Sequence, residues 1–372
     1  AAENHIQLLK NNLSNEVWES GCEWVWQQIF PLSMDLTGKH SNQTLQTQKK
    51  WSSINTMDPA YDQYEKAREF YRTHEYLAWI GEDESDEETI RSASEEALDQ
   101  SENANSPANT DSASAKISDQ PMIYPMQQLM DYDFLMKHFY NVHTSTTADR
   151  ELMNAKNLLS KDLTLEKEDA PQILIYHTHS QESYKNSKKD ENVVAVGQKL
   201  TDLLTEKGWN VYHDTTVYDL AVGKLDRSRA YTYALEGINE ILARYPSIQV
   251  VLDIHRDGVG EDVYLKTEIG GQPSARIMFF NGLSQTPEGP ISYLANPFRE
   301  DNLAFSLKLQ LKAEEYYPGF TRKIYLKGLR YNQHLRARSA LVEVGAQTNT
   351  FEEACNAMMP LAELLDMVLQ GK

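Results

Sequence analysis

The chain has 372 residues, and its 36 Lys and Arg stand against 55 Asp and Glu, which gives a formal net charge of −19. This length favours two domains, or one large domain with an appendage. An acidic chain of this kind is not expected to bind nucleic acid, because such binding needs a basic surface that neutralises phosphates. Its longest apolar runs, such as 173–176 and 250–252, are far shorter than the roughly 20 residues of a membrane-spanning helix.

The composition changes sharply before residue 121. Residues 1–81 carry many aromatic side chains at helical spacing, which predicts a small helical region. Residues 82–120 are acidic and small polar with almost nothing to bury, which predicts a disordered linker. An acidic docking segment is the alternative interpretation of this stretch. Cys22 and Cys355 lie far apart and no C-x-x-C occurs, so a zinc knuckle built on cysteines is excluded.

From residue 121 the pattern is that of a globular protein. Residues 121–168 predict a helical lead-in, with a helix over 149–163, and residues 169–372 predict the main domain. Strands alternate with helices in this domain, which predicts an α/β fold with a mainly parallel, twisted sheet and helices on both faces. The predicted strands are 172–176, 209–212, 248–254, 275–280, 323–326 and 340–344, and the predicted helices are 193–207, 228–244, 303–316 and 350–369.

Two strand ends carry side chains that bind metals. His177, His179 and Glu182 follow the apolar strand 172–176, and His255 ends the apolar strand 248–254. Parallel sheets place ligand sites beyond the carboxyl ends of their strands. The two histidines are two residues apart and would face the same way if the strand continued through them. His179 and Glu182 have the H-x-x-E spacing, so together with His255 they could supply the three protein ligands of a catalytic zinc site.

Glu343 lies in the middle of the apolar strand 340–344. A buried carboxylate without a partner is costly, so it is either paired or kept as a general base. We expect Glu343 to be the catalytic base, and an ion pair with Arg336 or Arg338 is the structural alternative.

Three polar side chains are candidates for substrate binding: Arg256, Asn332 and Arg338. Arg256 beside His255 could bind a substrate carboxylate. It could equally pair with Asp253 or Asp257.

The segments that carry these residues resemble the stage II sporulation protein P family. They are 173–184 (ILIYHTHSQESY), 252–257 (LDIHRD) and 341–345 (LVEVG), followed by 348–350 (TNT) and 352–354 (EEA) and preceded by 133–140 (DFLMKHFY). The resemblance covers about 122–370. It places the chain in the wider clan of zinc-dependent N-acetylmuramoyl-L-alanine amidases and implies that 169–372 is a catalytic domain with an amidase or phosphorylase/hydrolase-like fold.

The resemblance has further implications for activity, partners and location. It implies cleavage of the amide between N-acetylmuramic acid and L-alanine in peptidoglycan, with action on peptide cross-links also ascribed to the family. It also implies a membrane anchor before Ala1, a location outside the cytoplasm at the sporulation septum and engulfing membrane, and two partners. These are the lytic transglycosylase stage II sporulation protein D and stage II sporulation protein M.

The sequence departs from the clan at its first ligand. The clan's H-G-G is replaced by His177-Thr178-His179, and the glutamate, Glu182, follows much sooner. The H-x-x-E spacing also resembles zinc carboxypeptidases and favours His179 as the ligand, with His177 as an alternative first ligand or a residue that orients a ligand. A carboxypeptidase-like zinc peptidase and a wall-binding module with a dead site are the competing functions.

Overall fold

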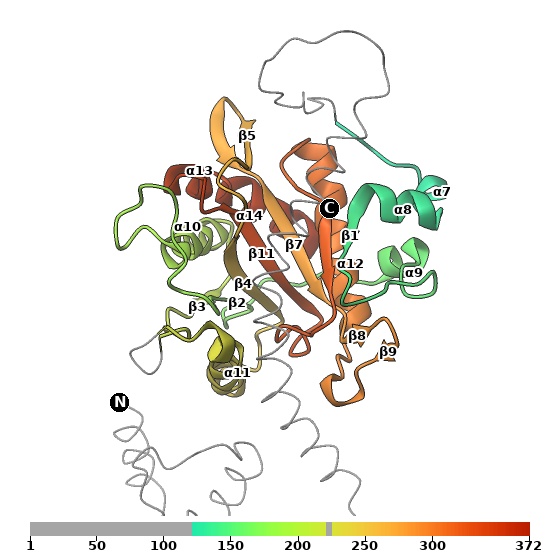
Figure 1. Cartoon of the computed structure of the whole chain (residues 1–372), viewed down its shortest axis with the longest axis horizontal. Helices are drawn as coiled ribbons and strands as arrows, with labels where there is room; N and C mark the ends of the chain where they lie inside the picture. Colours follow the sequence, from blue (N-terminus) through green and yellow to red (C-terminus); the bar gives the residue numbers. More distant parts are fainter. Residues whose placement is uncertain (1–120, 221–224) are drawn as a thin grey trace, which may run out of the picture. The chain divides into compact units, whose positions relative to one another are not determined.

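The computed structural model describes residues 121–220 and 225–372 (Figure 1). The predicted helical region 1–81 and the predicted linker 82–120 lie outside the described residues. In the described part of the chain, no helix is both long and apolar enough to cross a membrane.

Seven strands of the described residues form the main sheet, in the order β1-β10-β7-β11-β4-β2-β3. Neighbouring strands are parallel except β11 and β7, which are antiparallel. The prediction of a mainly parallel sheet is therefore confirmed, and the single antiparallel pair divides the sheet into two blocks of opposite direction. The strands are β1 (Tyr140–Val142), β2 (Ile173–Tyr176), β3 (Val211–His213), β4 (Val250–Asp257), β7 (Ile277–Gly282), β10 (Ile324–Lys327) and β11 (Arg338–Ala346).

Helices cover both faces of this sheet, as predicted. The helices are α7 (Met126–Leu129), α8 (Tyr132–Phe139), α9 (Ala155–Ser160), α10 (Val193–Glu206), α11 (Arg227–Arg244), α12 (Arg299–Tyr316), α13 (Phe351–Asn356) and α14 (Met358–Leu369), with a 3-10 turn η3 (Ser292–Leu294). Helices α10, α12 and α14 pack together on one face, and α11 lies on the opposite face over β2 and β4. The face that carries α11 is the one that bears the candidate site.

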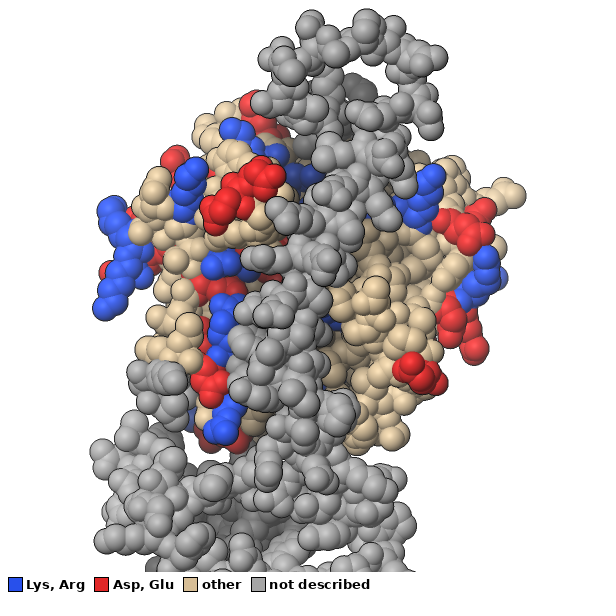
Figure 2. Space-filling view, viewed as in Figure 1, with Lys and Arg blue, Asp and Glu red and all other residues tan. Residues whose placement is uncertain are grey.

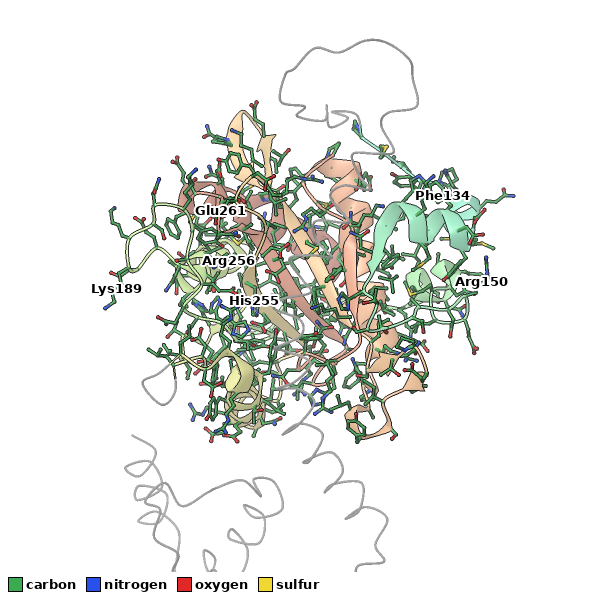
Figure 3. All side chains as sticks on the ribbon, in the orientation of Figure 1. Phe134, Arg150, Lys189, His255, Arg256 and Glu261 are labelled. Atoms are coloured by element: carbon green, nitrogen blue, oxygen red, sulfur yellow. The ribbon has the colours of Figure 1, made fainter. Side chains whose placement is uncertain are left out.

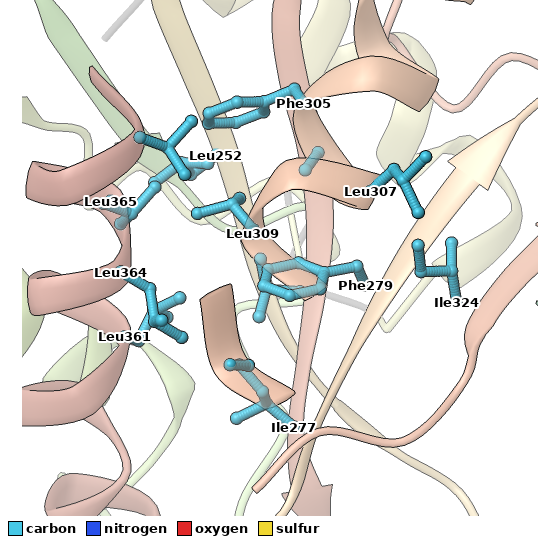
Figure 4. Packing of buried hydrophobic residues seen from close by; sticks show 14 of the residues in the cluster. Leu252, Ile277, Phe279, Phe305, Leu307, Leu309, Ile324, Leu361, Leu364 and Leu365 are labelled. Carbon is cyan, nitrogen blue, oxygen red and sulfur yellow. The ribbon is translucent and has the colours of Figure 1, made fainter. Parts of the chain in front are cut away.

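The larger core lies between the sheet and helices α12 and α14. Figure 4 shows Phe279 of β7 among leucines of both helices. Burying each such side chain contributes about 1.5–3 kcal/mol to folding. A smaller core beneath α11 contains Leu174, Tyr176, Val251 and Ile238. Alternate residues of β2 and β4 thus enter opposite cores, because side chains alternate along a strand.

Several elements differ from the sequence predictions. The helix predicted over 149–163 is only α9, since the Asn154 side chain caps its start and the Asp149 side chain bonds a separate turn at 151–152. The helix predicted over 350–369 is two helices that meet at Ala357. Strand β1 was not predicted, nor were the hairpins β5 (Lys266–Ile269) with β6 (Gln272–Ala275) and β8 (Gln285–Thr286) with β9 (Gly289–Pro290). A turn at Gly270-Gly271 joins β5 to β6.

Candidate active site

His255 and Glu343 lie on adjacent strands and on the same face of the sheet. The register of β11 and β4 places Glu343 directly beside His255. Their neighbours at alternate positions, such as Ile254 and Val342, enter the larger core. The two functional side chains therefore point to the face that carries α11. Figure 3 shows His255 near the middle of the sheet in this view.

His177 and His179 diverge, contrary to the expectation that they face the same way. Strand β2 ends at Tyr176, so the alternation of side chains does not continue. His177 Nδ1 lies 3.0 Å from the Ile254 carbonyl oxygen and its Nε2 lies 2.9 Å from His213 Nε2. The ring of His179 instead stands at 90° to the ring of His255, with centroids 5.2 Å apart. Both nitrogens of His177 are thus engaged away from His255, and His179 is the histidine that reaches the site.

Glu182 is buried at the site, with 3% of its side chain exposed. Its Oε1 accepts a 2.7 Å bond from Arg227 Nη2, and its Oε2 accepts a 3.1 Å bond from the Arg256 backbone N–H. Burial alone would raise the pKa of Glu182, but its contacts with His255, His179 and Arg227 lower it well below the ordinary value. The side chain is therefore a fixed, ionised carboxylate.

His255 lies between two carboxylates. Its Nε2 is 2.8 Å from Asp253 Oδ1, an ion pair without the alignment of a hydrogen bond, and its Nδ1 is 3.4 Å from Glu182 Oε2. Asp253 is itself held by the backbone N–H and hydroxyl of Thr178, at 2.9 and 2.6 Å. Burial would lower the pKa of His255, but Asp253 and Glu182 raise it well above the ordinary value. The surroundings favour a positive charge here, carried by a proton or by a bound cation.

Glu343 has a carboxylate oxygen that is shielded from solvent and unpaired. Among the described residues, its Oε2 has no hydrogen-bond partner. Burial and the nearby charge of Asp257 raise the pKa of Glu343 to about 8. The structural alternative fails, because Arg336 Nε donates to the Ile248 carbonyl and Arg338 Nε donates to the Leu163 carbonyl.

The three candidates for substrate binding lie in different places. Arg256 is at the rim of the site, where its guanidinium donates 3.0 Å bonds to the carbonyls of Ser183 and Asp257 and to neither carboxylate considered from the sequence. Asn332 is buried and donates to the Tyr231 carbonyl at 2.9 Å. Arg338 is at the start of β11, five residues before Glu343, so the structure does not bring it to the site.

Residues 48–366 match the family described as Stage II sporulation protein P. The chain belongs to the stage II sporulation protein P family. Stage II sporulation protein P of Bacillus subtilis (strain 168) is 28% identical over 214 residues, which are 53% of this chain and 50% of that protein. This family member thus spans about half the length of the curated relative it matches.

Two solved structures have a partial likeness to the fold. The CwlD amidase from Clostridioides difficile, in complex with the GerS lipoprotein, is 16% identical, with a TM-score of 0.34 over 53% of this chain and 99% of that chain. The N-acetylmuramyl-L-alanine amidase Ami1 from Mycobacterium smegmatis is 11% identical, with a TM-score of 0.33 over 55% of this chain and 99% of that chain. Likenesses of this size carry no weight for function.

His179, Glu182 and His255 of this family member are side chains of the kinds that bind zinc, although they do not converge on one point. In residues 121–220 and 225–372, no three His, Cys, Asp or Glu side chains are close enough together to form a metal site. His179 Nδ1 is nevertheless buried without a partner. His255 Nδ1 and Glu182 Oε2 stand at 3.4 Å, about the separation of two donors around a tetrahedral zinc. His255 also faces Asp253 with its other nitrogen, as metal-binding histidines commonly face a carboxylate.

Sequence reasoning missed three side chains that shape the site. Asp253, two residues before His255 on the same face of β4, could have been found from the alternation of side chains along a strand. Arg227, at the start of α11, gives no sequence signal because only the fold brings it to Glu182. Arg322 pairs with Asp257 at 2.5 Å and likewise comes from a distant loop.

Proposed function

We propose that this protein is a peptidoglycan hydrolase that uses zinc to cleave the amide between N-acetylmuramic acid and L-alanine of the stem peptide. The observation that carries the proposal is the buried, unpaired Oε2 of Glu343 beside His255, on the sheet face to which His179 also turns. An unpaired carboxylate at such a place is costly for folding and is expected where proton transfer requires it. Membership of the sporulation family supports peptidoglycan as the substrate.

Three side chains would hold the metal: His179, Glu182 and His255. Zinc bound there supplies Lewis-acid activation of water and of the amide carbonyl. Arg227 and the Arg256 backbone N–H fix the carboxylate of Glu182, and Asp253 faces His255. These contacts orient the candidate ligands, while His177 supports the neighbouring backbone at Ile254 from the other face.

Glu343 would move the proton. Its Oε2 would accept a proton from the attacking water and give it to the nitrogen of the departing L-alanine, which cannot leave as an amide anion. A pKa raised to about 8 suits a group that must accept and release a proton near neutral pH.

The setting of the reaction follows from the family resemblance. We place it outside the cytoplasm at the sporulation septum, with a membrane anchor in the whole protein. The lytic transglycosylase stage II sporulation protein D and stage II sporulation protein M would be its partners.

The variant Glu343→Gln tests this function, because it keeps the size of the side chain but cannot accept the proton. The assay is product release from purified sacculi, with identification of the new amino terminus. We expect a loss of turnover of about 10²–10⁴ with zinc content and melting temperature maintained. Glu268→Gln, on the exposed strand β5, is the matched control and should keep full activity.

Three outcomes would count against the proposal. An active Glu343→Gln protein would remove Glu343 from catalysis. Release of free amino acids from the carboxyl end of the stem peptide, without new L-alanine amino termini, would identify a carboxypeptidase-like enzyme. A zinc-loaded wild-type protein that binds sacculi and releases nothing would be a wall-binding module.

A further inference from the structure

The hydroxyl of Tyr231 lies in the wall of the candidate site without a protein partner. Tyr231 follows Arg227 by one turn of α11, so both side chains leave the helix on the same face. Its half-buried ring contacts the ring of His179, with centroids 5.5 Å apart and planes at 83°. Among the described residues, its hydroxyl makes no hydrogen bond, and solvent reaches it, whereas the hydroxyl of Tyr184 is shielded. This hydroxyl is therefore free to bond to a bound molecule.

The contacts of Tyr231 fix the orientation of its ring. Its backbone carbonyl accepts a 2.9 Å bond from Asn332 Nδ2, and its ring packs at 75° against the ring of Tyr331, with centroids 5.4 Å apart. Tyr331 and Asn332 both have positive φ, 47° and 56°, which non-glycine residues adopt infrequently. Strain of this kind persists only where the surroundings impose it, and it clusters at functional sites. The folded chain thus holds the ring of Tyr231 in place before a substrate binds.

The free hydroxyl has carboxylates near it. Burial and the charges of Asp253, Glu343 and Glu182 raise the pKa of Tyr231 well above its ordinary value. The hydroxyl therefore keeps its proton near neutral pH and acts as a hydrogen-bond donor. The three carboxylates come from β4, β11 and the loop after β2, so the hydroxyl lies close to the space that these elements border.

A negative charge that develops in this site needs a donor aimed at it. The chain has a net charge of −19. Figure 2 shows Lys and Arg interleaved with Asp and Glu over the part of the surface where Figure 1 labels α10, α11 and β5. Within the site, Arg227 Nη2 bonds to Glu182 at 2.7 Å and the Thr178 hydroxyl bonds to Asp253 at 2.6 Å. These donors are engaged, which leaves the hydroxyl of Tyr231 available.

We propose that the Tyr231 hydroxyl donates a hydrogen bond to the carbonyl oxygen of the amide under attack. This inference rests on the proposed function, in which Glu343 accepts a proton from the attacking water. The oxygen of the water bonds to the carbonyl carbon, and the carbonyl oxygen gains the negative charge that the hydroxyl stabilises. The C–N bond then breaks as the nitrogen takes the proton from Glu343. The proton of the Tyr231 hydroxyl stays on Tyr231 throughout.

The variant Tyr231→Phe removes the hydroxyl and retains the ring contacts. The assay is steady-state cleavage of a purified disaccharide–peptide muropeptide, measured as new L-alanine amino termini. We expect kcat to fall about 10²–10³-fold, the loss typical of one such donor. KM should change little, because the bond becomes strong only in the transition state. Zinc content and melting temperature should match those of the wild type.

The matched control is Tyr233→Phe. It makes the same change two residues later on α11, where Tyr233 packs against the smaller core. This variant should keep the kcat and KM of the wild type.

Binding of a phosphinate analogue separates a bond to the substrate from an action on Glu343. In this analogue a tetrahedral phosphinate group replaces the amide, so its oxygens resemble those of the transition state. Measured calorimetrically, Tyr231→Phe should weaken analogue binding about 10²–10³-fold, and should do so in the Glu343→Gln protein as well. Binding of the intact muropeptide to the Glu343→Gln protein should be the same with and without Tyr231→Phe. If the loss of analogue affinity disappears in the Glu343→Gln protein, the hydroxyl positions Glu343 and the inference is wrong.

The outcomes distinguish this inference from the proposed function. A Tyr231→Phe protein with the kcat of the wild type would overturn the inference and leave the proposed function intact. A variant that only raises KM, or that loses zinc or melts earlier, would also overturn it, because the hydroxyl would then serve substrate binding or folding. A wild-type protein that releases nothing from the muropeptide would overturn both, and this result is seen before any variant is made.

A wild-type protein that cleaves a different amide of the muropeptide would refute the proposed function alone. In that case Tyr231→Phe should still lower kcat for the amide that is cleaved, and an unchanged kcat would overturn the inference as well.

Discussion

The variant Gly197→Ala tests whether His177 is a structural residue behind the site. In a helix interior Ala is favoured over Gly by about 1 kcal/mol, so an open position in α10 would be stabilised. Here the added methyl carbon would lie 2.5 Å from Cε1 and 2.6 Å from Nε2 of His177. The ring is fully buried and is held by Ile254 and His213, so it cannot turn aside without breaking those contacts.

The size of each contribution determines whether Gly197→Ala stabilises or destabilises the protein. Overpacking costs about 1–3 kcal/mol, and each lost hydrogen bond about 0.5–1.5 kcal/mol. Together they exceed the gain in helix propensity, so we expect a net loss of about 1–3 kcal/mol and a melting temperature lower by roughly 2–10 °C. Urea denaturation and calorimetry measure both quantities.

The double variant His177→Ala/Gly197→Ala provides the internal control, because the methyl group then occupies the space left by the ring. Its loss of stability should be smaller than the sum of the two single losses by about 1–3 kcal/mol. Zinc content should stay unchanged in all three proteins. A stabilised Gly197→Ala protein, or additive losses, would refute the packing argument. A loss of zinc without a loss of stability in His177→Ala would make His177 a ligand.

Three further variants probe the ligand shell, an ion pair and the core. Asp253→Asn should lower zinc affinity about 10–100-fold in competition with a chelator, since Asp253 faces His255; unchanged affinity would mean that it does not orient the ligand. Asp366→Asn should cost about 1 kcal/mol at pH 7, because it removes the negative charge that strengthens the 2.9 Å bond from Trp209 Nε1 and pairs with Lys167 at 3.1 Å. Burial raises the pKa of Asp366, but the hydrogen bonds from Trp209, Lys167 and Gln370 and the charge of Lys167 together lower it to a net value below the ordinary one. The variant's loss in free energy of unfolding, measured by urea denaturation, should therefore have its full size above a pH of about 4 and become smaller below it. A loss that stays constant with pH would contradict this linkage. Phe279→Ala should destabilise by about 3–5 kcal/mol in the same assay, and a loss below about 1 kcal/mol would mean that the β7 core is loosely packed.

Local patterns in the sequence were enough for most elements. The apolar runs of β2, β4 and β11 and the helical stripes of α10 and α11 were predicted within a few residues. Local patterns failed where two short elements share one stripe, as in α13 and α14, and where pairing partners are distant, as in β1.

The candidate site also has residues that local patterns in the sequence reveal. His255 and Glu343 were recognisable because a titratable side chain interrupts or ends an apolar strand. The sequence also contained the reason to set Arg338 aside, since five residues of strand separate it from Glu343 by about 17 Å.

What the sequence determined by itself is therefore the set of chemical groups and the strands and loops that carry them. Only the tertiary structure decided which groups meet. The strand order β11-β4-β2 sets Glu343 beside His255, and the pairing of Tyr176 with Asp253 is the last along β2, after which His177 and His179 part. The antiparallel β7 then sets Met278 beside Glu343. These contacts join residues far apart in the chain, and no local preference encodes them, because they form only when the two cores are buried together.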